Sequence, residues 1–151
     1  MQLWFARTLH TSQGPIQFGH EHFRILHGDE RRLIVRLRHP SLKLLLIVLH
    51  APSEDDFEVV RQWWTTTSSL IPSGMASWTW FVMCDANSRV GSMQSKAIGS
   101  FGATTENERG AIFHEWLCSH GLWLPQTFEQ SHIGPHDTWT HPTLARARID
   151  F

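Results

Sequence analysis

Residues 42–52, LKLLLIVLHAP, contain the longest apolar run of the chain. Leu44–Leu49 includes no polar side chain and shows no alternation of apolar and polar residues. A run of this length is far too short to span a membrane, and it is typical of a strand covered on both faces. We therefore predict a buried strand over Leu42–Leu49 that ends at His50.

A second near-continuous apolar run, Trp78–Met83, predicts another such strand, which leads directly into Cys84-Asp85-Ala86-Asn87. Between the two strands, the acidic residues 54–56 favour the start of a helix with Ser53 as its N-cap, and Pro72–Gly74 ends that unit. The helical spacing predicts one inward stripe of side chains: Phe57, Val60, Arg61 and Trp64.

The remaining patterns predict shorter elements. They are a strand over Gln2–Ala6, a strand pair over His22–Leu26 and Arg32–Leu37 about the turn at Gly28-Asp29, a helix from Glu108 to about His120 between Asn107 and Gly121, a short strand over Leu122–Leu124, and a last strand over Arg148–Phe151. This order favours an α/β (α+β) sandwich of mixed sheets flanked by helices. We expect residues 1–151 to form one domain, incomplete because its last strand has barely begun.

Composition narrows the function classes. Thirteen Lys+Arg against fourteen Asp+Glu give a formal net charge of -1. The chain therefore has no overall positive charge that would attract nucleic acid. An enzyme that binds phosphate through a metal ion stays possible. With Cys84 and Cys118 as its only cysteines, the chain has no disulfide framework, which favours a reducing compartment. Since Met1–Thr8 lacks a signal-peptide pattern, we expect an intracellular protein, nuclear or cytoplasmic, that is neither secreted nor in a membrane. The oligomeric state stays open.

Polar residues lie at the predicted strand ends, where a rigid scaffold meets solvent. His50 ends one strand, Asp85 and Asn87 follow the next, and Asp150 falls in the last. Two residues apart on extended chain, Asp85 and Asn87 would point to the same side, and they suit a hydrated divalent ion or a phosphate oxygen. His50 is a candidate general acid, and Asp150 a carboxylate that could orient a histidine.

Each of these residues also has a purely structural interpretation. Asp85–Ser88 has the composition of a turn in which Asx side chains bond their own backbone. His50 before Ala51-Pro52 can simply end a strand in a chain with eleven histidines. Asp150 alone is uninformative.

The order of seven short motifs adds information. They are His50–Pro52, Cys84–Asn87, Gly99–Gly102, Asn107–Gly110, Gln126–Phe128, Thr138-Trp139 and Ile149–Phe151. This series resembles the endonuclease/exonuclease/phosphatase superfamily, and it is most similar to the apurinic-type endonuclease domains of non-LTR retrotransposons. The resemblance covers the chain from about Gln2 to its last residue, and the histidine of the first motif is closer to deoxyribonuclease I.

The resemblance implies a deoxyribonuclease I-like fold and Mg²⁺-dependent hydrolysis of DNA phosphodiesters, with Mn²⁺ as a possible substitute. It implies that Asp85 aligns or deprotonates the attacking water, and that Asn87 binds the scissile phosphate and helps Asp85 fix the metal. His50 stands where deoxyribonuclease I has an acid histidine, and Asp150 where a carboxylate bonds the catalytic histidine. Ser53 lies near a phosphate-contacting position.

Two further residues are candidates for substrate binding. Trp139 lies in a polar loop near the expected active face, where an aromatic ring can contact DNA. Arg148, like its neighbour Arg146, is close enough to Asp150 in sequence to meet phosphate. Most other tryptophans fall at core-like spacing, and we expect the arginines of 31–38 to form a solvated strand face.

The chain also departs from the family pattern. The metal-ligand glutamate would precede Met1, and the histidine of the Ser-Asp-His motif would follow Asp150. Cys84 and Ala86 replace the glycine and phenylalanine of Gly-Asp-Phe-Asn. We therefore expect a partial site, truncated at both ends, for which Glu21 is only a weak replacement ligand.

Three function classes stay open at this stage. The first is a DNA-nicking endonuclease, the second a non-catalytic remnant or a nuclease-like domain that depends on a partner, and the third a phosphatase for a smaller phosphate ester. A zinc site would require His114, Cys118, His120 and Cys84 to converge, and no His-Glu-x-x-His or Cys-x-x-Cys motif supports one. We expect the loop histidines His132, His136 and His141 to be solvent-exposed.

Overall fold

The computed structural model describes residues 2–140 and 142–151; His141 lies outside them. Contacts divide the chain into two compact units, one formed by Met1–Leu49 with Thr67–Met83 and the other by His50–Thr66 with Cys84–Phe151. The fold is α+β, with mixed sheets and two α-helices, as the sequence predicts.

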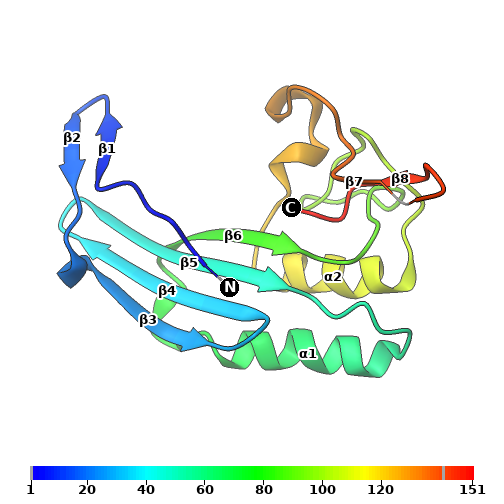
Figure 1. The fold of residues 1–151 in the computed structure, drawn as a ribbon, viewed down its shortest axis with the longest axis horizontal. Coiled ribbons are helices and arrows are strands. Elements are labelled where there is room, and N and C mark those ends of the chain that lie inside the picture. The colour runs from blue at the N-terminus through cyan, green and yellow to red at the C-terminus, as the bar shows by residue number, and fades with distance from the viewer. Residues whose placement is uncertain (1, 141) are drawn as a thin grey trace. The chain divides into compact units, whose positions relative to one another are not determined.

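The main sheet has the strand order β3-β4-β5-β6 (Figure 1). Its strands are β3 (Phe23–Gly28), β4 (Arg32–His39), β5 (Leu42–His50) and β6 (Thr79–Asp85). The β3–β4 and β4–β5 pairs are antiparallel, whereas β6 follows the direction of β5 (Figure 1). The connection from β5 to β6 includes a helix, as a parallel neighbour requires. The predicted strand pair and both apolar strands are thus confirmed.

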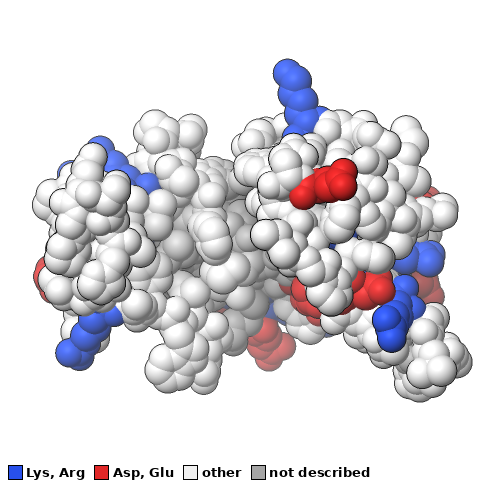
Figure 2. Space-filling model, turned by 90° about the horizontal axis from the view of Figure 1, so that it is seen from above, with Lys and Arg blue, Asp and Glu red and all other residues white. Residues whose placement is uncertain are grey.

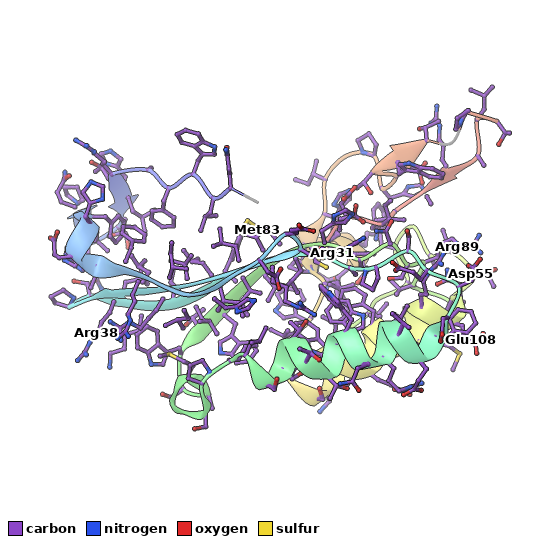
Figure 3. All side chains as sticks on the ribbon, turned by 60° about the horizontal axis from the view of Figure 1, so that its bottom comes forward. Arg31, Arg38, Asp55, Met83, Arg89 and Glu108 are labelled. Carbon is purple, nitrogen blue, oxygen red and sulfur yellow. The ribbon has the colours of Figure 1, made fainter. Side chains whose placement is uncertain are left out.

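One hydrophobic cluster of the first unit lies on one face of this sheet. Phe18, Val35, Leu37 and Leu46 are buried together there, because alternate residues of β4 and β5 point to the same side. Figure 3 shows Arg31 and Arg38 at opposite ends of β4. Arg38 is exposed, as predicted for a solvated strand face, but Arg31, Arg32 and Arg36 are only partly exposed. The Arg32 side chain binds Asp29 and Thr67, so the predicted solvated face is present only in part.

The N-terminal segment differs from the prediction. Residues 2–6 form no strand, and the first hairpin instead joins β1 (Thr8–Thr11) to β2 (Gly14–Gln17). Gly14, at φ +113°, permits the tight turn. Phe5 packs edge-on against Phe18 at 5.2 Å between ring centroids, so side-chain packing rather than strand pairing holds this segment.

Helices α1 (Phe57–Ser69) and α2 (Glu108–Ser119) pack through aromatic side chains (Figure 1). The Trp64 ring stacks on Phe113 at 5.0 Å and lies 4.7 Å from Trp116. Val60 and Trp64 are buried, so the predicted stripe is present. Arg61 is not part of it, because its exposed guanidinium pairs with Glu115 at 2.8 Å.

Of the two predicted helix N-caps, one is wrong and one is correct. Asp56, not Ser53, caps α1, because its carboxylate accepts hydrogen bonds from the backbone N–H groups of Glu58 and Val59. Asn107 caps α2 as predicted and accepts from Gly110 N–H at 2.9 Å. Gly121, at φ +63°, follows the end of α2.

The C-terminal third is mostly irregular, and one predicted strand is wrong there, since Leu122–Leu124 forms no strand. The predicted last strand is present in part, because Ile149–Phe151 pairs antiparallel with Cys84–Ala86. The strand assigned in this region is β8 (Arg146–Ala147), which pairs antiparallel with β7 (Trp139–Thr140). Short 3₁₀ turns complete the described structure: His20–His22, Ser73–Met75, Pro125–Thr127 and Glu129–Ser131. No helix in the described residues has the length and apolar character needed to cross a membrane.

Candidate active site at the strand ends

The last residues of the chain extend the end of β6. Cys84 and Phe151 exchange both backbone hydrogen bonds, at 2.6 and 2.7 Å, and Ala86 N–H donates to Ile149 C=O at 2.8 Å. Asp85 and Asp150 therefore form the intervening pair of an antiparallel bridge. In such a pair the side chains share one face, with Cβ atoms about 4.5–5.5 Å apart.

His50 joins this pair from the end of β5. Its Nε2 lies 3.8 Å from Asp85 Oδ2, and both side chains are partly open to solvent. The backbone fixes this approach, because Ala51 N–H donates to Asp85 C=O at 2.8 Å. The two strand ends thus bring together the histidine and carboxylate that the sequence analysis singled out.

Asn87 is tied into the same junction. Its amide Nδ2 donates to Ala51 C=O at 2.8 Å, and its backbone N–H donates to Asp85 Oδ1 at 3.0 Å. Asn87 has φ +46°, a left-handed conformation that asparagine tolerates better than most residues. The Asx turn is therefore present, and it leaves Asp85 Oδ2 and the amide oxygen of Asn87 without hydrogen bonds from described residues.

Cys84 and Ala86, the two departures from the resembled motif, are both buried. Burial raises the pKa of the Cys84 thiol, and the neighbouring carboxylates of Asp85 and Asp150 raise it further. The thiol is therefore a neutral core group.

The donor set fits Mg²⁺ better than it fits zinc. Asp85 and Asp150 offer two carboxylates on one face, and Asn87 adds an amide oxygen. Mg²⁺ is often held by one or two carboxylates and keeps several waters. Within residues 2–140 and 142–151, no group of three or more His, Cys, Asp or Glu side chains could hold a metal ion.

His114, considered above for zinc, belongs to a different network. Its Nε2 lies 2.7 Å from Ser95 Oγ, and its Nδ1 lies 3.3 Å from Glu106 Oε2. Ser95 Oγ also accepts from Ala97 N–H and Ile98 N–H, at 3.0 and 3.3 Å. Since both ring nitrogens are engaged, this network fastens the loop before α2 to the helix.

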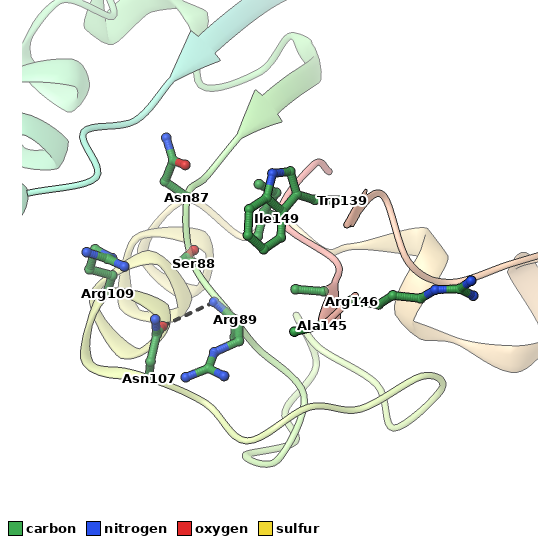
Figure 4. A pocket seen from close by; sticks show the side chains of 10 residues that line it. Asn87, Ser88, Arg89, Asn107, Arg109, Trp139, Ala145, Arg146 and Ile149 are labelled. Atoms are coloured by element: carbon green, nitrogen blue, oxygen red, sulfur yellow. Dashed lines mark hydrogen bonds between the residues drawn. The ribbon is translucent and has the colours of Figure 1, made fainter. Parts of the chain in front are cut away.

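The predicted substrate-binding residues differ in their surroundings. Trp139 lies in β7 and lines a pocket that also includes Asn87 and Ile149 (Figure 4). Ser53 is exposed, and its carbonyl accepts from Arg109 Nη1 at 2.7 Å.

Arg148 is only 5% exposed, and it binds its own chain. Its Nε donates to His136 C=O at 2.8 Å and its Nη1 to Phe101 C=O at 3.2 Å. Burial lowers the pKa of this guanidinium, against the opposing effect of Asp137. The Arg148 side chain therefore stabilises the surrounding loops.

Sequence reasoning missed Arg89 and Arg109, which line the same pocket as Trp139. Arg109 lies within the Asn107–Gly110 motif, which was the one available signal. No sequence signal pointed to Arg89, because only the tertiary fold places it beside Asn107.

A comparison with protein-family models found no match to the chain, and a comparison with curated proteins found none either.

Proposed function

We propose that the second unit carries a metal-dependent phosphodiesterase site that nicks DNA, on a scaffold of deoxyribonuclease I type. One observation carries the proposal: His50, Asp85, Asn87 and Asp150 lie together at adjoining strand ends. The order of the motifs along the chain supports the same assignment. Each of these groups has a task in phosphodiester hydrolysis.

Asp85 aligns the attacking water through Oδ2, the carboxylate oxygen outside the Asx turn. Asn87 binds a non-bridging oxygen of the scissile phosphate, since the hydrogen bond to Ala51 fixes the orientation of its amide. His50 is about half exposed and can protonate the leaving oxygen. Mg²⁺, when bound by Asp85, Asp150 and the amide oxygen of Asn87, would neutralise charge on the phosphoryl oxygens.

The test is nicking of supercoiled plasmid by the purified chain with Mg²⁺ or Mn²⁺, with a chelator as the first control. We expect Asp85→Ala to lower the rate by on the order of 10²-fold or more. Glu54→Gln, an exposed acidic residue of the same unit, is the matched control and should leave the rate unchanged. If the folded chain does not nick DNA with either metal, the proposal fails and a non-catalytic role replaces it.

A further inference from the structure

A serine, a histidine and a glutamate lie in a row outside the candidate active site. Ser95 Oγ lies 2.7 Å from His114 Nε2, and the other ring nitrogen, Nδ1, lies 3.3 Å from Glu106 Oε2. A hydroxyl on one ring nitrogen and a carboxylate on the other is the arrangement of a nucleophile, its general base and the group that orients the base. None of the three has a task in the proposed hydrolysis of DNA, so they are available for a different chemistry.

The hydrogen bonds around Ser95 fix the direction of its proton. Its Oγ accepts from Ala97 N–H at 3.0 Å and from Ile98 N–H at 3.3 Å. Since a hydroxyl has two acceptor positions and one hydrogen, the hydrogen is left for His114 Nε2. That nitrogen is then the acceptor, and the neutral ring carries its own hydrogen on Nδ1, toward Glu106. This is the tautomer that can take a proton from Ser95.

The exposure of the three side chains suits the same roles. Ser95 is exposed, whereas the side chains of His114 and Glu106 are only 13% and 10% exposed. A substrate can therefore reach the hydroxyl, while the shielding of the other two strengthens their electrostatic interaction. A serine that only anchored the loop would need no carboxylate behind the histidine. A general base does need one, because the imidazolium formed by proton transfer must be stabilised.

Backbone N–H groups lie where the negative oxygen of an acyl-transfer intermediate would form. The amide of Lys96, the residue after Ser95, has no hydrogen bond within the part of the chain that the structure describes. The amides of Ala97 and Ile98 already point at Ser95 Oγ, and the negative oxygen would be bonded to the same carbon as Oγ. Such preorganised donors stabilise the charge that develops during acyl transfer.

The charges of the chain favour a neutral substrate for this serine. Figure 2 shows charged side chains in small separate groups on one face, without a broad patch of either sign. The formal net charge of the whole chain is only -1. No strong field would therefore steer an anion or a cation to Ser95. Since Ser95 is exposed, a small and unhindered ester can approach its hydroxyl.

We propose that Ser95, His114 and Glu106 form a nucleophilic triad that hydrolyses small neutral carboxylic esters. His114 Nε2 takes the Ser95 proton as Oγ forms a bond to the ester carbonyl carbon. The carbon–oxygen bond to the alcohol then breaks, and the alcohol leaves with the proton from His114. A water molecule, deprotonated by the same nitrogen, attacks the acyl-serine and releases the carboxylic acid, and the proton returns to Oγ.

Hydrolysis of p-nitrophenyl acetate by the purified chain in EDTA tests this activity without any metal ion. We expect Ser95→Ala to abolish turnover and His114→Ala to lower kcat/KM by on the order of 10²-fold. Ser100→Ala, at an exposed serine of the same loop, is one matched control. His136→Ala is the other, since the His136 ring lies 3.5 Å from the carboxylate of Asp137. Both controls should keep the wild-type rate.

A fluorophosphonate probe identifies the nucleophile directly. Attack by Ser95 Oγ forms an oxygen–phosphorus bond and expels fluoride, so the wild-type peptide that contains Ser95 should gain the mass of the probe. We expect His114→Ala to be labelled at least about tenfold more slowly, because the base is missing. This measurement on the wild-type chain does not depend on whether any variant folds.

Glu106→Gln tests the positioning residue, because it keeps the size of the side chain and removes its charge. That charge stabilises the imidazolium formed in the transition state, so we expect kcat to fall at least about tenfold with KM unchanged. Circular dichroism verifies that each variant is folded. Wild-type kcat in folded Glu106→Gln would show that Glu106 only holds the loop, and it would overturn its place in the triad.

Cys118 is a competing nucleophile, because its exposed thiol lies 3.9 Å from Ser95 Oγ. Thiols also attack activated esters. We expect Cys118→Ala to retain both ester hydrolysis and the probe adduct on Ser95. Turnover that is lost in Cys118→Ala and kept in Ser95→Ala would assign the reaction to the thiol and overturn the proposal.

Equal rates in wild type, Ser95→Ala and His114→Ala would also overturn it, as would the absence of a probe adduct on Ser95 in the folded wild-type chain. Because nicking of DNA requires a metal ion and ester hydrolysis is measured without one, this proposal and the proposed function fail independently.

Discussion

Asp85 and Asp150 face each other across an antiparallel bridge at the end of β6. Like charges directly opposite in a sheet repel, so this arrangement lowers stability unless a cation compensates. The pair therefore ties the proposed metal chemistry to a property of the fold that can be measured without any substrate.

The first prediction follows from that repulsion. We expect Mg²⁺ at about ten times its Kd to stabilise the wild-type chain by about 1.4 kcal/mol, or roughly 4 °C in Tm. Asp150→Asn should raise stability by about 0.5 kcal/mol without metal and remove most of the Mg²⁺ effect. Thermal unfolding with and without EDTA measures both. Glu54→Gln should behave as wild type, and an equal Mg²⁺ effect in Asp150→Asn would contradict a site at the pair.

The second prediction concerns His50, which lies 3.8 Å from Asp85 at a strand end. His50→Gln should lower the nicking rate by roughly 10²-fold, because a positioned general acid contributes about that much. His27 offers a matched control, since it also pairs with an aspartate, at 2.9 Å from Asp29, but lies in the first unit. His27→Gln should leave the nicking rate unchanged. Equal losses in the two variants would indicate that both act through stability alone.

The third prediction uses Gly110, the glycine of the Asn107–Gly110 motif. A Cβ on Gly110 would overlap the carbonyl oxygen of Arg89. Gly110→Ala should therefore destabilise the chain by about 1–2 kcal/mol, although alanine is the better helix former. Urea unfolding measures this loss. Gly74→Ala, where the added carbon meets nothing within 4 Å, should stay close to wild type.

Helix and strand features that neighbouring residues determine were predicted correctly, and features that depend on a competing or distant group were not. Asn107 was identifiable as a cap, because asparagine is a favoured N-cap residue and the helical pattern begins directly after it at the acidic Glu108. Ser53 was wrong because Asp56, three residues later, offers a competing cap, and local preference does not choose between them. The strand predicted for residues 2–6 failed because pairing depends on a partner that the pattern does not specify.

In the candidate site too, residues marked by the local sequence could be predicted, whereas residues placed by tertiary packing could not. His50, Asp85 and Asn87 could be predicted, since each directly follows an apolar strand. Arg148 looked similar in sequence, yet it is buried and binds Phe101 and His136, which lie far from it along the chain. Arg89 was missed for the opposite reason. Nothing in its local sequence marks it, and loop packing brings it beside the first turn of α2.

The last prediction concerns Asp29, in the turn between β3 and β4. Burial alone would raise the pKa of this carboxyl, but hydrogen bonds from His27, Arg31 and Arg32 hold it well below its usual range. A folded-state pKa below the unfolded value contributes stability above the unfolded pKa, and that contribution is lost as pH falls through about 4 toward the lower folded value. The free energy of unfolding should therefore decline steeply on the acid side.

Asp29→Asn should cost about 1–2 kcal/mol at neutral pH, since it weakens hydrogen bonds to a charged group that is partly screened by solvent. The difference from wild type should shrink as the pH falls below about 4, because protonation removes the same charge from the wild-type chain. Urea unfolding at a series of pH values measures this convergence, with exposed Glu30→Gln as the control. Parallel curves for wild type and Asp29→Asn across this range would show that the charge of Asp29 does not stabilise the turn.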